Sequence, residues 1–432
     1  MTGPRRAPDR EPGPGIGIAD LPLIEDEINN LNTEADMLIT QLRNKLKSLT
    51  PEPTSGKKDK WFDYAASITP SRSKRGFPHF LTDIPGNERR ELPDAVLYGP
   101  FARILANMDG SKNLRRLIQE AEWEIGQILP EAQIKKYTSA ISYLSDYGYL
   151  KTAFKKSLTE KAIVEALHEL GVRPGDLLFV HSGLSPFGRI DDGAETVINA
   201  IMSAIGKQGT ALFPTFTMSF IYMDGMLIKN ERTRPYDQND PSQVWVGNIP
   251  QTFLSRKGVI RSVHPTHSVA GLGPMAETCL SAHKETDPPT CRNSPFGKLL
   301  EHQGKILYFG SGLAPTTFLH FLENEMDLPY LAEAVCRIKD QDGTIRTVFI
   351  PKHLPGHRDF YSSNAENCKF FKKVIAHGLE IKTVSLELGE LHLIDAVQLY
   401  ELGTAALRED PFLLLCDNPE CLFCARHKII PN

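Results

Sequence analysis

The chain has 432 residues, and its 49 lysines and arginines against 53 aspartates and glutamates give a formal net charge of -4. This balance excludes a strongly basic protein whose bulk charge would attract nucleic acid or an anionic membrane. The sequence has no apolar run long enough for a membrane span, no signal-peptide core, and an odd number of cysteines. We therefore expect a cytoplasmic protein without a disulfide framework, built from one large domain and smaller attachments.

The N-terminal part predicts little compact structure. Residues 1–20 combine proline, glycine and charge with few bulky apolar side chains, which predicts disorder. In residues 21–50 the apolar positions step by four and three, which predicts a coiled-coil-like helix. That helix could form a homodimer through residues 24–49 or lie on the protein's own core. Residues 51–93, rich in Lys, Arg, Pro, Ser and Gly, predict a linker.

Residues 94–153 predict a small helical domain. Helical periodicity recurs there, and a short strand follows, as in a winged-helix-like domain. The third helix mixes lysines with acids, so we expect a protein contact or a structural role rather than DNA recognition. The apolar face of that helix consists of Ile134, Tyr137, Ile141 and Leu144.

Residues 157–405 predict an α/β domain with a layered sheet. An apolar strand at 176–180, a helix at 194–206 and a strand at 211–216 follow one another with short connections. This unit implies parallel strands joined by a right-handed crossover. A further strand at 305–310 leads into a helix, so the sheet continues past the middle of the chain. In such sheets ligands bind beyond the carboxyl ends of the strands.

The loop after the first of these strands carries His181, Ser182, Gly183, Leu184 and Ser185. Its hydroxyls, backbone amides and small residues could line a channel for a pantetheine arm or contact a phosphate. An ordinary polar loop is the alternative, and spacing alone favours that alternative.

A second loop, at 261–268, contains two histidines three residues apart. Without a nearby third ligand, two imidazoles are weak evidence for zinc. Hydrogen-bond donors next to small residues suit the wall of a cofactor site better. The residues expected in that wall are Arg261, Ser262, His264 and Ser268.

The third segment follows the strand at 305–310. On a helix, Thr316, His320, Glu323 and Asp327 would form a polar stripe in which His320 faces Glu323 one turn on. A carboxylate beside an imidazole fixes its tautomer and stabilises the imidazolium, as a base working near neutral pH requires. The solvated face of an amphipathic helix fits the periodicity equally well, but the position after a strand and a glycine loop favours a catalytic role.

Together these segments resemble the aminoglycoside 3-N-acetyltransferase family from about Ser157 to Gln398. The family's motifs occur in order as GDLLFVHSGLSPFG, DGAETVINAI, GTALFPTFT, GVIRSVHPTHSVAGLG, SPFGKLL and TTFLHFLENEMDLP. Each motif alone is weak, but the ordered set is specific. The resemblance implies the fold of that family, acetyl-CoA as donor with its pantetheine along the first two loops, and His320 and Glu323 as the catalytic pair.

We therefore expect a CoA-dependent N-acyltransferase acting on an amine of a small molecule. His320 would deprotonate the amine, Glu323 would orient His320, and the amine would attack the thioester directly. Donors near Ser182 or Thr317 would hold the tetrahedral oxyanion. No G-x-S-x-G motif supports a covalent route. The donor could be acetyl-CoA, another acyl-CoA or a carrier-protein thioester, the last implying a carrier-protein partner.

The expected acceptor loop, residues 222–245, mixes charges. It contains Arg232 and Arg234 beside Asp237 and Asp240, whereas a polycationic aminoglycoside calls for an acidic cleft. We therefore expect a role in natural-product biosynthesis on another amine. Antibiotic inactivation is the alternative within this class, and a non-catalytic CoA-sensing or regulatory protein is the alternative of another class.

Residues 406–432 form a cysteine-rich tail. Cys416, Cys421, Cys424 and His427 give the pattern C-x4-C-x2-C-x2-H, which could bind zinc tetrahedrally. Against this hypothesis, the spacing to His427 is tight, and the usual separation between two ligand pairs is missing. The sequence leaves zinc binding open.

Overall fold

The structure is a computed structural model that divides into two compact units, Met1–Asp59 and Lys60–Asn432. The residues that it describes are 29–31, 33–35, 37–41, 59–74, 78, 81–94, 99–224, 226–228, 233–361 and 365–428. Among the described residues, no helix is both long enough and apolar enough to cross a lipid bilayer.

In the first unit, the described residues between 29 and 41 are helical, as the apolar spacing predicts. All of them are exposed, including Leu31 at 57% and Leu38 at 52%. These two leucines lie seven residues apart, as on one face of a coiled-coil helix. A homodimer through residues 24–49 stays a prediction, and the disorder expected for residues 1–20 lies outside the described residues.

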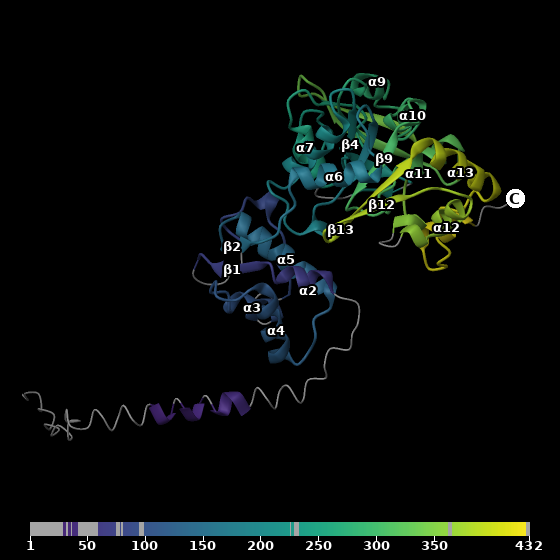
Figure 1. Ribbon diagram of the computed structural model, residues 1–432. Coiled ribbons are helices and arrows are strands. Elements are labelled where there is room, and N and C mark those ends of the chain that lie inside the picture. Colours follow the sequence, from purple (N-terminus) through teal and green to yellow (C-terminus); the bar gives the residue numbers. More distant parts are fainter. Residues whose placement is uncertain are drawn as a thin grey trace, which may run out of the picture. The chain divides into compact units, whose positions relative to one another are not determined.

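The second unit begins with a small helical subdomain. Its elements are α2 (Lys60–Ala65), β1 (Ile68–Arg72), α3 (Pro100–Ala106), α4 (Leu114–Ile125), α5 (Glu131–Asp146) and β2 (Leu150–Phe154) (Figure 1). The strand after the helices pairs antiparallel with β1, from Ile68 opposite Phe154 to Arg72 opposite Leu150. The expected linker at 51–93 thus contains a helix and a strand, and the winged-helix-like domain expected at residues 94–153 stays a prediction.

A seven-stranded mixed sheet organises the rest of this unit, in the order β12-β13-β9-β3-β4-β8-β7. Its strands β3 and β4 are parallel, as are β3 and β9, which agrees with the predicted strand–helix–strand unit. The remaining pairs are antiparallel. The strands are β3 (Leu177–Ser182), β4 (Thr210–Pro214), β7 (Ile260–Arg261), β8 (Val269–Leu272), β9 (Lys305–Phe309), β12 (Lys382–Leu386) and β13 (Gly389–Asp395).

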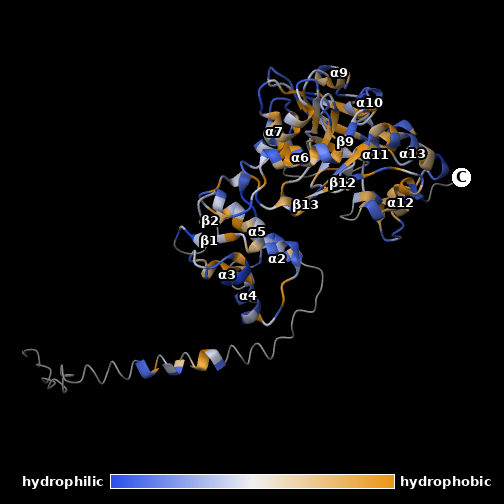
Figure 2. Cartoon of the chain, viewed as in Figure 1, coloured by the Kyte–Doolittle hydropathy of each residue, from blue (hydrophilic) through white to orange (hydrophobic). Residues whose placement is uncertain are grey.

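Helices cover both faces of this sheet, because its strands are apolar on both sides. Along β3, Leu178 and Val180 join one core cluster, whereas Leu177 and Phe179 join the other. The first cluster contains α6 (Glu160–Leu170), α7 (Ala194–Ile205) and α8 (Asn248–Leu254). The second contains α9 (Ala276–Leu280), α10 (Pro295–Glu301), α11 (Phe318–Glu325), α12 (Lys369–Ala376) and α13 (Ala396–Glu409). Figure 2 shows hydrophobic residues concentrated on these layers.

Two further parts complete the unit. A four-stranded antiparallel sheet has the order β11-β10-β5-β6, with β5 (Phe220–Met223), β6 (Met226–Leu227), β10 (Ala332–Lys339) and β11 (Ile345–His353). The cysteine-rich tail packs into the second core cluster through Leu413, Leu414, Leu415 and Cys424, and it contains α14 (Leu422–Lys428). The tail is therefore part of the core and not a separate appendage.

Candidate active site

Helix α11 carries the predicted His–Glu pair inside the protein. Its residues 318–324 are all buried, with His320 at 6% and Glu323 at 0% exposure, which excludes the solvated-face alternative. The helix has only eight residues, so the expected stripe is shorter than predicted. Thr316 lies before the helix and Asp327 after it, where Asp327 adopts a φ of 49°.

Three side chains form a linear chain of contacts. Nδ1 of His320 lies 2.5 Å from Oε2 of Glu323. The other oxygen of Glu323 accepts a hydrogen bond of 2.5 Å from Nε of Arg358. Arg358 is fully buried between the rings of Tyr330 and Phe423, with its guanidinium 4.9 and 5.1 Å from their centroids.

The charge on Glu323 depends on these partners. Burial raises the pKa of Glu323, but the positive charge of Arg358 and the contact with His320 outweigh burial and lower it to about 2. Glu323 is therefore a carboxylate at neutral pH. Such an acceptor keeps the proton of His320 on Nδ1 and leaves Nε2 as the basic nitrogen.

Nε2 of His320 meets a tyrosine that the sequence analysis missed. It lies 2.7 Å from the hydroxyl of Tyr361, at the end of a short 3-10 turn at Asp359–Tyr361. Burial raises the pKa of the Tyr361 hydroxyl, so this group is protonated and can donate to Nε2. The tyrosine residue as a whole is still 44% exposed. Tyr361 therefore stands between Nε2 of His320 and the solvent.

Other histidines surround this pair in neutral form. Burial lowers the pKa values of His181 and His353 to about 3. Burial and the imidazoles of His353, His264 and His320 together lower the pKa of His267 well below its usual value. At neutral pH these three rings are therefore uncharged.

The predicted loop after β3 borders a cavity of ≈ 800 Å³, which is lined by residues 182–185, 188–190 and 192–195. The first turn of α8 and side chains of the small subdomain, among them Trp61 and Tyr64, complete its wall. Neither His181 nor His320 lines it. His181 is buried against Tyr308, and its Nε2 has no hydrogen-bond partner among the described residues. The structure thus brings four of the five predicted loop residues into one cavity.

The polar side chains of the second predicted loop form hydrogen bonds within the protein. Arg261 donates through Nη2 to the carbonyl of Thr215 at 2.8 Å and through Nε to Oγ of Ser268 at 3.1 Å. Oγ of Ser262 accepts from the amide of Val269. Arg261 and Ser262 line a different cavity, of ≈ 670 Å³.

His264 and Thr317 are likewise engaged within their own segments. His264 stacks on His283 at 4.5 Å, and its Nδ1 accepts from the amide of His267 at 3.0 Å. Thr317 donates through Oγ1 to the carbonyl of Pro315 at 3.2 Å. A cofactor-binding role for the second loop and for Thr317 stays a prediction.

The tail brings three of its four predicted metal ligands together. The ligand atoms of Cys416, Cys421 and Cys424 lie within 4.8 Å of one another and of a nitrogen of His357. The structure does not bring His427 into this group, and the Nε2 of His427 instead accepts from Nη2 of Arg426 at 2.9 Å. Sequence spacing could not reveal His357, because it joins the cysteines from 59 or more positions away.

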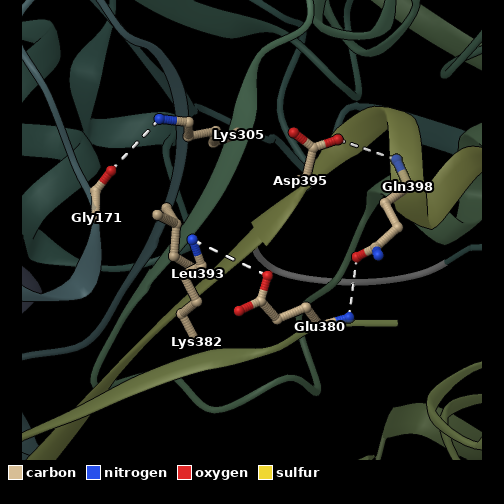
Figure 3. A pocket seen from close by; sticks show the side chains of 7 residues that line it. All are labelled: Gly171, Lys305, Glu380, Lys382, Leu393, Asp395 and Gln398. Carbon is tan, nitrogen blue, oxygen red and sulfur yellow. Dashed lines mark hydrogen bonds and ion pairs between the residues drawn. The ribbon is translucent and has the colours of Figure 1, made fainter. Parts of the chain in front are cut away.

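A further cavity, of ≈ 300 Å³, lies at the opposite edge of the sheet (Figure 3). Lys305 opens β9 there, whereas the predicted loops follow the carboxyl ends of β3 and β9 at Ser182 and Phe309. Its charges are internally paired, because Lys305 lies 2.7 Å from Asp176. Lys382 likewise lies 4.0 Å from Glu380 (Figure 3). We do not assign the active site to it.

The structure thus combines a layered α/β fold with a buried His–carboxylate pair. Residues 179–408, just over half of the chain, match the family model described as aminoglycoside 3-N-acetyltransferase. The chain belongs to this family, as its motifs predict. Three of the four cysteine and histidine residues in the tail cluster lie beyond the matched range.

Two curated relatives are similar to part of this chain. Aminoglycoside N(3)-acetyltransferase III of Acinetobacter baumannii is 34% identical over 178 residues, 40% of this chain and 62% of that protein. Aminoglycoside N(3)-acetyltransferase IX of Micromonospora chalcea is 29% identical over 179 residues, 40% of this chain and 63% of that one. The chain thus spans less than two thirds of the length of these curated relatives.

A solved structure supports the fold. AAC-IIIb, in a binary complex with CoASH, superimposes with a TM-score of 0.51 at 24% identity, over 59% of this chain and 97% of that one. The agreement covers nearly all of the solved chain, so the α/β part of the second unit has the family's architecture. The N-terminal residues and the tail are additions to it.

Proposed function

We propose that this protein is an N-acyltransferase that moves an acetyl group from acetyl-CoA to a primary amine. The observation that carries the proposal is the buried His320, held by the Glu323 carboxylate at Nδ1 and with the basic Nε2 accepting from the hydroxyl of Tyr361. An ammonium group must lose a proton before its nitrogen can attack a thioester, and Nε2 is the group that receives it. The negative charge of Glu323 then stabilises the imidazolium.

The neutral amine attacks the thioester carbonyl, and the nitrogen of the tetrahedral intermediate then loses a second proton. The C–S bond breaks to give the amide and the CoA thiolate, which takes up one proton from His320 while the other proton leaves to solvent. Oγ of Ser182 is buried without a hydrogen-bond partner among the described residues, at the end of β3 beside the β9 terminus. Such a donor suits the oxyanion of the intermediate, to which one well-placed donor contributes about 3 kcal/mol.

The large cavity beyond β3 fits the donor. The first turn of α7 faces it through Ala194 and Glu195, and no side chain caps the amides at that helix start. A free helix N-terminus favours a phosphate, and Arg90 and Arg189 line the same cavity. CoA would place its phosphates there and its pantetheine along residues 182–185. The binding of CoASH by the related AAC-IIIb supports this choice of donor.

The acceptor loop favours an amine other than a polycation. Asp237 forms an ion pair of 3.1 Å with Lys339, and Asp240 lies 3.7 Å from Arg234. Both acids are thus neutralised by neighbours within the protein, which weakens their attraction for a multiply charged substrate. A biosynthetic or tailoring acylation of a less charged amine is the role that we favour.

An aminoglycoside acceptor is the second candidate. The curated relatives are named aminoglycoside N(3)-acetyltransferases, and a mutant of the structural neighbour AAC(3)-IVa was solved in complex with a gentamicin. That structure supports the fold at 24% identity, so the argument for this substrate rests on the family name.

Release of free CoA thiol from acetyl-CoA in the presence of an amine panel tests both candidates. The panel should hold gentamicin, sisomicin, simple monoamines and amino sugars with one amine. We expect amine-dependent thiol release, with kcat/KM higher for the monoamines. A higher kcat/KM for the aminoglycosides would reverse the choice of acceptor. CoA binding by calorimetry without thiol release for any amine would contradict the enzyme and favour a CoA-sensing protein.

A further inference from the structure

The tail and the loop before Arg358 converge on four metal-binding side chains. His357 comes from the segment after β11, Cys416 from the chain after α13, and Cys421 and Cys424 from the start of α14. Cys421 and Cys424 are three residues apart at the start of a helix, so they lie on the same side of it. Sγ of Cys424 is 3.6 Å from Nδ1 of His357.

These distances suit a tetrahedral ion. Zinc bonds of about 2.3 Å to sulfur and about 2.0 Å to nitrogen put neighbouring ligand atoms about 3.5–3.8 Å apart. The four atoms lie within 4.8 Å of one another, so small side-chain adjustments close the site. All three cysteines are free thiols, and any single disulfide would leave a sulfur and the imidazole unused. Three soft sulfur ligands with one imidazole select zinc over magnesium or calcium.

The surrounding contacts hold the four ligands in place. The carboxylate of Asp417, next to Cys416, pairs with Lys369 at 2.7 Å and with Lys428 at 2.5 Å, which ties the tail to α12 and to the end of α14. The amide of Asp359 donates to the carbonyl of Leu414 at 2.8 Å, which ties the His357 loop to the same tail. The ligand set is therefore supported before any ion binds.

We propose that His357, Cys416, Cys421 and Cys424 bind one structural zinc ion, and that this ion fixes the loop that orients the catalytic pair. All four protein ligands are present, so the site is closed to substrate, as structural zinc sites are.

The backbone connects the zinc site to the catalytic pair. His357 is followed by Arg358, which donates to Glu323, and four residues after His357 comes Tyr361, which contacts Nε2 of His320. Phe423, between Cys421 and Cys424, packs on the guanidinium of Arg358 at 5.1 Å. Gly356 permits this packing, because a Cβ there would lie 2.1 Å from the Phe423 ring. The zinc site stands on its own geometry, whereas its effect on catalysis rests on the proposed function.

Metal content of the purified full-length chain is the primary test. Inductively coupled plasma mass spectrometry should find about one zinc per chain after gel filtration with a non-thiol buffer. Replacement by Co²⁺ should give the visible d–d bands of a tetrahedral site and sulfur-to-cobalt charge-transfer absorption. An absence of stoichiometric zinc, combined with a failure of added Zn²⁺ or Co²⁺ to bind, would overturn the proposal. A finding of one iron per chain in place of zinc would show that the site binds a different metal, and it would contradict the assignment of zinc.

Variants assign the ligands. Cys421→Ser and His357→Ala should lower bound zinc by at least about tenfold, whereas the matched controls Cys291→Ser and His427→Ala should retain it. Zinc loss from His427→Ala with retention in His357→Ala would refute the ligand set. If a ligand variant fails to fold, the metal content and the Co²⁺ spectrum of the unmodified chain still decide.

Activity is a separate readout. Zinc-depleted protein should lose about tenfold or more in kcat with the KM for acetyl-CoA changed little, because the ion acts on the catalytic pair and not on the donor cavity. Unchanged kcat in a zinc-free but folded variant would remove the catalytic link and leave the metal site intact. Zinc binding in a protein without any acyl transfer would contradict the proposed function and not the site.

Discussion

The hydroxyl of Tyr361 lies 2.7 Å from Nε2 of His320, the nitrogen that the proposed mechanism reserves for the proton of the acceptor. The two residues are 41 positions apart, and the tyrosine reaches the imidazole from a turn outside α11. In the free protein this hydroxyl therefore occupies the position that an incoming amine must take. When the acceptor binds, the Tyr361 side chain must either move away from Nε2 or remain in contact with the bound amine.

Tyr361→Phe tests this relationship. The ring is retained while the competing hydroxyl is lost, so we expect the KM for the amine to fall or to stay constant and kcat to change less than about tenfold. Steady-state kinetics with the best amine of the panel measures both. A loss of kcat as large as that of His320→Ala would instead make the tyrosine a proton carrier.

Replacement of His320 by alanine should remove the base. We expect kcat to fall by at least about 10²-fold, the lower range for general-base catalysis, with the Kd for CoA nearly unchanged. His168→Ala, at the exposed end of α6, is the matched histidine control and should keep full activity. Full activity of His320→Ala would eliminate the proposed mechanism.

Glu323→Gln should destabilise the fold as well as slow the reaction. Arg358 would remain fully buried without its counter-ion, which typically costs about 3–5 kcal/mol. Urea unfolding of the variant and of the unmodified chain gives the difference. Equal unfolding midpoints would show that the Arg358–Glu323 pair contributes little to stability.

The same carboxylate predicts a pH dependence of stability. The pKa of Glu323 is about 2 in the folded protein, below the value of about 4.3 expected after unfolding. Its ionised form therefore stabilises the fold fully above about pH 4.3, and this contribution is lost as the pH falls toward 2. The stability difference between the unmodified chain and Glu323→Gln should shrink over that interval. A constant difference from pH 6 to 3 would contradict the lowered pKa.

Ser182→Ala tests the oxyanion donor. Because its Oγ is buried without a partner among the described residues, we expect kcat to fall by about 10²-fold while the Kd for CoA changes little. Ser185→Ala, on the exposed part of the same loop, should instead act on the KM for acetyl-CoA. Equal small effects of both variants on KM alone would assign Ser182 to donor binding.

Local patterns predicted the sheet and the contact between His320 and Glu323. The apolar run of β3, the helical periodicity of α7 and the spacing of His320 and Glu323 are properties of neighbouring residues, and the structure contains all three. The short strand β1 was missed because ITPSR has a single large apolar residue and a proline, which reads as a loop.

The spacing of residues along the sequence could not predict which distant side chains contact the His–Glu pair and the tail cysteines. Arg358, Tyr361 and His357 reach α11 and the tail only after β10 and β11 have turned the chain back. A buried arginine has no periodic signature, because its position depends on one distant carboxylate. His427 was chosen over His357 for the same reason, since only sequence proximity was visible.

The subdomain ahead of the family's core is anchored to the donor loop. The hydroxyl of Tyr64 accepts from the amide of Arg189 at 2.8 Å, and Gly188 approaches the same ring so closely that a Cβ would lie 2.6 Å from it. A shortened chain that lacks this subdomain would keep the His–Glu pair. It would lose the contacts of Tyr64 with Gly188 and Arg189. Under the proposed function its affinity for CoA should fall, because the extension supplies one wall of the proposed CoA cavity.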